Sequence, residues 1–212
     1  MTLHVPPCLW DEACATQLLR RYWGRHPDGS PRYTGSRFER LAGGGDKPSV
    51  ADRFTADDVL AVSTLSVTLP ARAALRLVEP SAEERYGDLL EQLPTTIELV
   101  DAKPDIIAKD GPAWQLWEQL REIDDIGPVG AGKLLARKRP RLLPVYDSVI
   151  KRVFLRPGND LSFWTDVRAA LRADDRKLVR HLETVRDLAG IGDDITVLRV
   201  LDTMAWMHGK DS

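Results

Sequence analysis

Helix start and stop signals recur along the chain from residue 55 onward, and they constrain the fold more than any other feature of the sequence. Apolar residues between these signals recur at helical spacing, and no stretch alternates as a half-buried strand would. The pattern predicts an all-α fold, formed by residues 1–212 as one helical domain with two lobes and a cleft. The predicted starts are the capping boxes Thr55–Asp58 and Ser81–Glu84, then Pro70, Gly111–Pro112, Asp160 and Asp193, and the predicted stops are Gly190 and Gly209.

Two parts of the chain frame this helical series. Residues 9–23 are expected to form an opening helix, and helices are also expected over 147–155, 160–172, 175–189 and 193–208. Residues 24–54 contain repeated glycine and proline and predict a long irregular loop, a length that is uncommon without a function. The glycine run 43–45 lacks the Gly-Lys-Ser/Thr ending of a phosphate-binding loop, so loop flexibility is the favoured interpretation.

The stretch from Lys133 to Arg156 is strongly basic, although the whole chain carries a formal net charge of −2 at pH 7. It holds eight lysines and arginines but a single acidic residue, Asp147. Basic side chains gathered on one face attract phosphate groups, so this stretch predicts a polyanionic partner. A solvated surface with no ligand is the alternative interpretation.

Cysteine and histidine usage argues against several classes of site. Cys8 and Cys14 would lie on different faces of one helix, so neither a disulfide scaffold nor an iron–sulfur or metal site is expected from them. The four histidines are scattered without metal-ligand spacing. No metal and no organic cofactor is expected. No apolar run approaches the 20 or so residues of a membrane span, and no signal peptide is evident, so we expect a cytoplasmic protein.

The most informative stretch runs from Arg121 to Asp147, and a helix-hairpin-helix motif is predicted over residues 114–139. A helix is expected to end near Ile123, a tight turn at Gly127 and Pro128 follows, and a second helix is expected to start near Val129. The first N–H groups of that second helix lack partners, and small residues let a phosphate approach them. The residues predicted to contact DNA phosphates are Gly127, Val129, Gly130, Gly132, Lys133, Lys138, Arg139 and Lys151.

These residues resemble a known family. The segment Ile126–Leu135 is similar to the hairpin of the helix-hairpin-helix DNA glycosylase superfamily. Pro140 and Pro144 then match a proline-containing loop, and Asp147–Val153 is similar to the Asp-Gly-Asn-Val-Lys-Arg-Val segment of adenine glycosylases. The resemblance covers roughly residues 114–156. Many members of the superfamily bind an iron–sulfur cluster through four cysteines. This chain has only two, so it resembles a divergent member without that cluster.

The resemblance implies a monofunctional glycosylase that hydrolyses the N-glycosidic bond of a damaged or modified base. Asp147 would be the catalytic carboxylate that stabilises positive charge on the sugar, and it would also cap helix 147–155. Gly132 occupies the position of the lysine that forms a Schiff base in bifunctional members, so no lyase activity is expected. Candidate walls of a pocket for the flipped base are Trp114, Trp117 and Tyr146.

Two other functions remain open from the sequence. The chain could be a DNA-binding module that kept the hairpin and lost catalysis, in which case Asp147 is only a helix cap. It could instead be a helical protein-interaction adaptor. The surface for a partner protein would then be the C-terminal stripe of Leu198, Leu201, Met204, Ala205, Trp206 and Met207.

Overall fold

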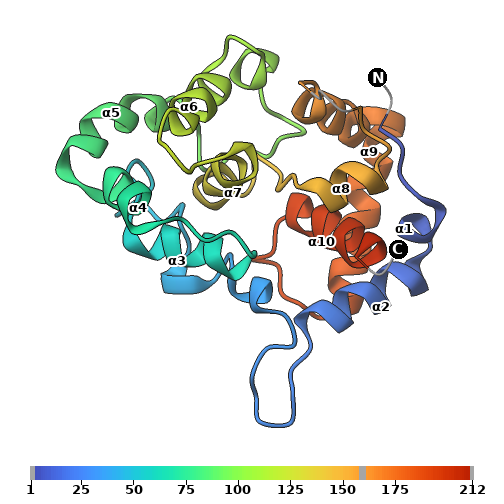
Figure 1. Ribbon diagram of the computed structural model, residues 1–212. Helices are drawn as coiled ribbons and strands as arrows, with labels where there is room; N and C mark the ends of the chain where they lie inside the picture. Colours follow the sequence, from blue (N-terminus) through green and yellow to red (C-terminus); the bar gives the residue numbers. More distant parts are fainter. Residues whose placement is uncertain (1–2, 158–160, 211–212) are drawn as a thin grey trace. The chain divides into compact units, whose positions relative to one another are not determined.

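The fold is all-α, as the helix signals predicted. The computed structural model describes residues 3–157 and 161–210, and within these ranges it has no strand, only an isolated bridge between Arg25 and Pro31 (Figure 1). None of the helices in the described part is long and apolar enough to cross a membrane. The α-helices are α1 (Pro7–Trp10), α2 (Glu12–Trp23), α3 (Ala56–Thr64), α4 (Ala71–Val78), α5 (Pro80–Glu91), α6 (Pro112–Arg121), α7 (Pro128–Lys138), α8 (Ser148–Val153), α9 (Phe163–Ala189) and α10 (Val197–Gly209), and the 3-10 helices are η1 (Thr34–Arg37), η2 (Leu41–Gly43) and η3 (Pro104–Ile107).

The chain divides into two compact units. One is formed by Met1–Tyr33 together with Pro144–Ser212, and we call it the discontinuous unit because it uses both ends of the chain. The other, Thr34–Leu143, is continuous in sequence and is called the inserted unit. The discontinuous unit contains α1, α2 and α8 to α10, and the inserted unit contains α3 to α7 with the three 3-10 helices.

Helix α10 is the centre of the discontinuous unit, where it packs against α2, α8 and α9. Leu198, Leu201, Met204 and the other aliphatic residues of its stripe are all buried. The adaptor hypothesis needed this stripe on the surface, so that part of the hypothesis is wrong. The period of an amphipathic helix does not distinguish a core face from a docking face.

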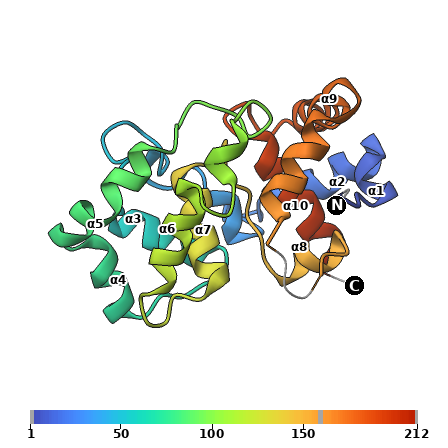
Figure 2. The same ribbon diagram turned by 90° about the horizontal axis from the view of Figure 1, so that it is seen from above.

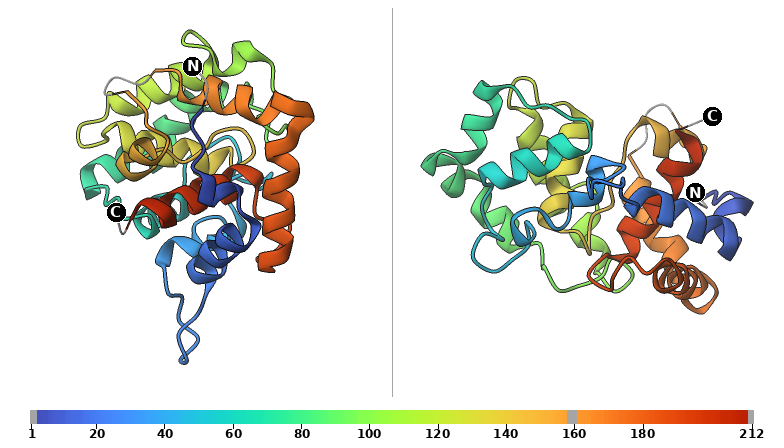
Figure 3. Two further views of the ribbon diagram at one scale, coloured as in Figure 1. Left: turned by 90° about the vertical axis from the view of Figure 1, so that its right-hand side faces the viewer. Right: turned by 90° about the horizontal axis from the view of Figure 1, so that it is seen from below.

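Helix α9 contains a break that separates its two halves. Backbone geometry is non-helical from Ala173 to Arg176, and Figure 3 (left) shows the two halves of α9 running in different directions. The separate helices expected over 160–172 and 175–189 therefore correspond to these halves. Gly190 ends the helix in the left-handed conformation (φ 67°), as predicted. The predicted cap Asp160 lies outside the described residues, and Ser162 stands at the N-cap position.

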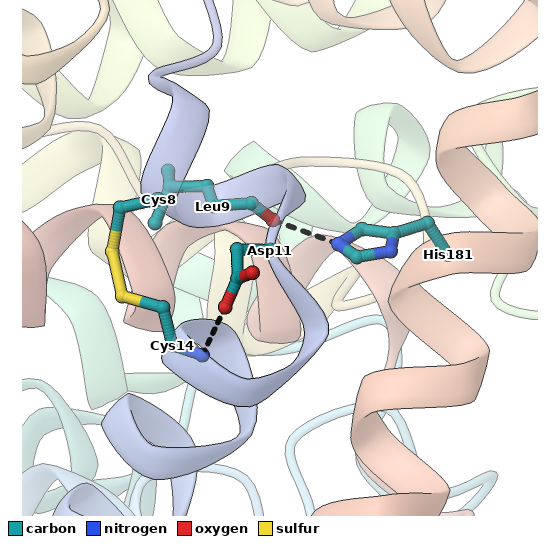
Figure 4. The surroundings of a disulfide bond; sticks show 5 residues. All are labelled: Cys8, Leu9, Asp11, Cys14 and His181. Carbon is teal, nitrogen blue, oxygen red and sulfur yellow. Dashed lines mark hydrogen bonds between the residues drawn. A yellow bond between two sulfur atoms is a disulfide. The ribbon is translucent and has the colours of Figure 1, made fainter.

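The opening helix is also interrupted, and this overturns the expectation for the cysteines. Helix α1 ends at Trp10, and Asp11 caps α2 by accepting a hydrogen bond from the Cys14 N–H (2.7 Å). The break brings Cys8 and Cys14 together in a disulfide bond with a Cα–Cα distance of 5.7 Å (Figure 4). On one continuous helix the two thiols would have pointed apart. The Leu9 carbonyl, between them in sequence, contacts the His181 ring nitrogen of α9 at 2.7 Å.

Local sequence signals place most of the helix starts of the inserted unit. The Thr55–Asp58 capping box opens α3 with both reciprocal hydrogen bonds, as predicted, and α6 starts with Gly111 as its N-cap. The second predicted box is wrong, because α5 begins one residue before Ser81, at Pro80, with no side-chain cap. Proline at the first position of a helix loses no hydrogen bond and so competes with a capping serine. In the discontinuous unit, Thr196 rather than Asp193 caps α10.

Candidate functional site

The α6–α7 turn was the strongest expectation for a functional site. Helix α6 ends at Arg121 and α7 begins at Pro128, and the two helices lie side by side (Figure 2). Gly127 is the N-cap of α7 in an extended conformation, and no side chain caps this helix. The N–H groups of the first turn come from Val129 and Gly130, because Pro128 has none. An uncapped first turn carries partial positive charge.

The glycines of this turn differ in how close a side chain at each position would come to neighbouring atoms. A Cβ atom added to Gly130 would lie 3.6 Å from Val67 and 3.7 Å from Leu69, which are ordinary contacts in a buried place. A Cβ atom on Gly127 or Gly132 would meet nothing within 4 Å. Gly127 has an ordinary φ of −76°, and Gly132 lies inside α7. Neither packing nor backbone conformation therefore requires glycine at these two positions.

Aromatic side chains join the two helices at this turn. The indole N–H of Trp117 donates to the Pro128 carbonyl (3.2 Å), and the Arg121 guanidinium lies 4.4 Å from the centre of the Trp117 ring. Trp114 packs edge-on to Trp117 (5.1 Å between ring centres) and is buried. Both tryptophans thus belong to the packing of the turn, and nothing in their contacts identifies a base pocket. Arg121 is the exposed cation beside the turn that sequence reasoning missed, although its position four residues after Trp117 was a signal for stacking.

Acidic residues also lie at the turn. Asp124 and Asp125 are both exposed, and Asp125 has a positive φ of 72°, which aspartate tolerates better than most residues. Their charges oppose the approach of a phosphate. They reduce the electrostatic attraction that Arg121 and the α7 dipole provide.

The first part of the basic stretch, residues 133–139, does not form a basic face, and this is the main correction to the expected site. Lys133, Lys138 and Arg139 were expected to contact phosphate, but their exposed fractions are 5%, 0% and 1%. The Lys133 ammonium donates to the Leu65 carbonyl (2.8 Å). Further along, Arg141 pairs with Glu98 and the buried Arg156 pairs with Asp166. Counting charges along the sequence could not reveal that Lys133, Lys138 and Arg139 turn inward.

Arg137 and Lys138 share one buried carboxylate. Asp58 accepts from Arg137 Nε (3.1 Å) and from Lys138 Nζ (3.0 Å), and all three side chains are almost inaccessible. Arg137 also donates to the carbonyls of Phe38, Glu39 and Leu41, and Lys138 donates to the Val50 carbonyl (2.7 Å). These cations therefore hold the irregular segment 34–54 in place. Burial lowers the pKa of Lys138 below 10.5, and Asp58 opposes that shift.

Arg139 extends this cluster toward α5. It donates to the carbonyls of Leu90 (2.5 Å), Leu93 and Ala51, and it pairs with Asp52 at 2.7 Å. Burial lowers its pKa, while the hydrogen bond and the charge of Asp52 raise it. Carbonyls at the end of a helix lack partners within the helix, and Arg139 supplies one at the end of α5. The function of residues 137–139 is thus structural.

The expected catalytic residue lies in the discontinuous unit, whereas the hairpin lies in the inserted unit. Asp147 caps α8 as predicted, and its Oδ1 accepts from the N–H groups of Val149 (3.0 Å) and Ile150 (3.1 Å). The Asp147 side chain is half-buried, as is Lys151 one turn later. Tyr146 stacks on Phe163 with 3.9 Å between ring centres, so this face of Tyr146 is already covered.

Comparison with known proteins covers nearly the whole chain. The model of DUF6308, described as a family of unknown function, matches residues 15–209. The chain belongs to this family. No curated protein and no solved structure gives a significant match. In this DUF6308 member, the matched range includes both the α6–α7 turn and Asp147.

Proposed function

We propose that this protein binds DNA through its sugar–phosphate backbone, and that the α6–α7 turn makes the contact. One observation carries the proposal: Gly127 and Gly132 lie at this turn in open space, where neither packing nor backbone conformation requires glycine. A glycine inside a helix costs about 0.5–1 kcal/mol relative to alanine. Keeping Gly132 in α7 is explained if a partner approaches the backbone at a distance that a methyl group would prevent.

The chemistry of the turn fits a phosphate group. The uncapped start of α7 offers the N–H groups of Val129 and Gly130 and the positive end of a helix dipole. Arg121 adds a full positive charge, and it is held over the ring of Trp117, whose indole N–H donates to the Pro128 carbonyl. Contacts of this kind recognise the DNA backbone and carry no sequence information. Because Asp124 and Asp125 oppose them, this turn alone should bind weakly.

The proposal is tested with Gly132→Ala. This variant should be more stable by about 0.5–1 kcal/mol, because alanine favours helix, yet it should bind a DNA duplex about tenfold more weakly, equivalent to one lost charged hydrogen bond. Fluorescence anisotropy at two salt concentrations measures binding, and urea unfolding measures stability.

Gly87→Ala is the matched control for this test. Gly87 lies inside α5 of the same unit, where an added Cβ atom would make only an ordinary 3.6 Å contact. Its substitution should raise stability and leave DNA binding unchanged. Wild-type affinity in the more stable Gly132→Ala variant would disprove the contact, and absence of duplex binding by the unmodified protein would disprove DNA binding altogether.

A second candidate function is hydrolysis of an N-glycosidic bond by Asp147. What favours it is that a half-buried aspartate opens α8 with its carboxylate held by two backbone N–H groups. The similarity to adenine glycosylases leads one to expect an aspartate at such a helix start. A carboxylate fixed in this way can stabilise positive charge that develops on a deoxyribose ring as the base leaves.

Catalysis by Asp147 can be separated from its capping role with Asp147→Asn. Asparagine still caps a helix, so stability should change by about 1 kcal/mol or less. If the candidate holds, the wild-type protein binds a duplex containing a cationic azasugar far more tightly than an undamaged duplex, and the variant loses this preference. Asp11→Asn is the control, since Asp11 caps α2 in the same way. Equal binding of both duplexes by the wild type would mean that Asp147 acts only as a cap.

A further inference from the structure

An exposed hairpin follows α2 and has no evident role in folding. Residues 25–30 are all exposed, so the hairpin contributes no side chain to the core. Figure 1 shows it as the blue loop that extends beyond the end of α2. Ordered loops that contribute nothing to a core often carry a binding function.

Backbone hydrogen bonds nevertheless order this hairpin. The His26 N–H donates to the Ser30 carbonyl (2.8 Å) and the Arg32 N–H donates to the Gly24 carbonyl (2.9 Å), on either side of the bridge between Arg25 and Pro31. At the tip, one oxygen of Asp28 accepts from both the N–H and the hydroxyl of Ser30. The loop is thus a short antiparallel ribbon.

The ribbon and the helix end before it carry an unusual local charge. Four arginines and a single acidic residue occur between residues 20 and 32, in a chain with a net charge of −2. All four arginines, at positions 20, 21, 25 and 32, are exposed. Within the described residues, neither Arg25 nor Arg32 forms an ion pair, and Arg25 donates only to the nearby Gly29 carbonyl (2.8 Å). Exposed guanidinium groups without carboxylate partners are well suited to bind phosphate.

The hydrogen-bond pattern places the two unpaired arginines on opposite faces of the ribbon. Arg25 is opposite Pro31, whereas Arg32 is opposite Gly24, one position away, and side chains at successive positions of a strand point to opposite faces. The Arg32 Cδ lies 3.3 Å from where a Gly24 Cβ would be, in agreement with this assignment. The ribbon therefore presents a cation on each side.

We propose that this ribbon, residues 24–32, inserts into the major groove of duplex DNA, where Arg25 and Arg32 contact the phosphates of the two facing strands. That groove is about 12 Å wide, which admits a two-stranded ribbon, and both of its walls carry phosphates. This inference rests on the proposed DNA binding and adds a second contact surface, in the discontinuous unit. The two arginines also supply exposed positive charge, which the buried side chains of residues 133–139 do not provide.

The test is the double substitution Arg25→Gln with Arg32→Gln, compared with Arg53→Gln and Arg85→Gln. The control pair removes the same charge from exposed positions of the inserted unit. The slope of log affinity against log salt concentration is negative. Loss of two phosphate contacts should reduce its magnitude by about 1.8. Affinity for the duplex should fall more than tenfold at moderate salt, while the control pair should change neither quantity by half as much. Circular dichroism checks that both variants are folded.

The choice of duplex also tests the groove. Wild-type protein should bind a DNA duplex more tightly than an A-form RNA duplex, whose major groove is deep and narrow, and a small molecule that fills the minor groove should not displace it. Equal loss of binding in the two double variants, or stronger binding to single-stranded DNA, would overturn the inference. A weakened Gly132→Ala variant beside an unaffected Arg25/Arg32 variant would overturn only this inference. No duplex binding by the wild type would reject the proposed function as well.

Discussion

Asp58→Asn should destabilise the protein by about 3–5 kcal/mol, because it leaves two buried cations without their carboxylate. Arg137 and Lys138 both donate to Asp58, and the same carboxylate accepts from the backbone and hydroxyl of Thr55. Asparagine keeps the shape of the side chain but removes the charge. The free energy of unfolding in urea at neutral pH measures the effect.

Asp57→Asn is the matched control for this prediction. Asp57 precedes Asp58 in the first turn of α3, but it is exposed. Its loss removes only a favourable interaction with the helix dipole, about 0.3–1 kcal/mol. An Asp58→Asn defect no larger than that of Asp57→Asn would contradict the structural role of the buried cluster.

The Asp58→Asn defect should also depend on pH. Burial already lowers the pKa of Lys138 from 10.5, and removal of the Asp58 charge should lower it further. The unfolded chain then binds more protons than the folded chain between the lowered pKa and about 10.5, so stability rises with pH in this window. Unfolding measured from pH 7 to pH 10 should show the variant recovering part of its lost stability relative to the wild type.

Gly45→Ala should also be strongly destabilising, by about 1–3 kcal/mol or more, because it overpacks the same cluster. An added Cβ atom would lie 2.5 Å from the Arg137 carbonyl oxygen and 2.8 Å from Asp58 Oδ1. Neither atom can move easily, since one belongs to the α7 backbone and the other accepts from Arg137 Nε, in a carboxylate whose second oxygen is held by Lys138. The sequence predicts a flexible loop for the glycine run, but Gly45 is buried and packed against α7.

The control for Gly45→Ala is again Gly87→Ala, and the two substitutions should have opposite signs. In α5 alanine is favoured over glycine by about 0.5–1 kcal/mol, and the space for a methyl group exists. Thermal unfolding of the two variants measures the contrast. A neutral Gly45→Ala variant would show that residues 43–45 are free to shift away from α7.

Local signals in the sequence were sufficient to predict several elements. The Thr55–Asp58 box, the Gly111–Pro112 start, the α6–α7 turn and the Asp147 cap each depend on residues within a few positions of one another. Such capping interactions are nearly independent of the rest of the fold. The break between α1 and α2 was also readable, because Asp11 has the character of an N-cap. Taking it into account would have brought Cys8 and Cys14 into range for a disulfide.

The candidate site was harder to predict because its failures depend on long-range partners. Whether Lys138 faces solvent is decided by Asp58, 80 residues earlier, and by the Val50 carbonyl. Arg139 likewise turns toward carbonyls at the end of α5. A run of basic residues is compatible with an exposed face or with a buried network, and only the distant acceptors distinguish them. The exposed arginines at 25 and 32 belong to a local excess of positive charge between residues 20 and 32, a signal that sequence reasoning missed.

Because the chain leaves the ribosome from its amino-terminal end, the two units can complete their folding at different times during synthesis. The inserted unit is contiguous, so α3 to α7 can assemble soon after residue 143 has emerged. Helix α2 is made before the inserted unit, and it packs against α9 and α10, which are made after that unit. During synthesis the apolar side of α2 therefore has no packing partner from α9 or α10 until well over a hundred further residues have been added. Nascent chains of this protein should consequently depend on a chaperone for their amino-terminal segment more than for their middle.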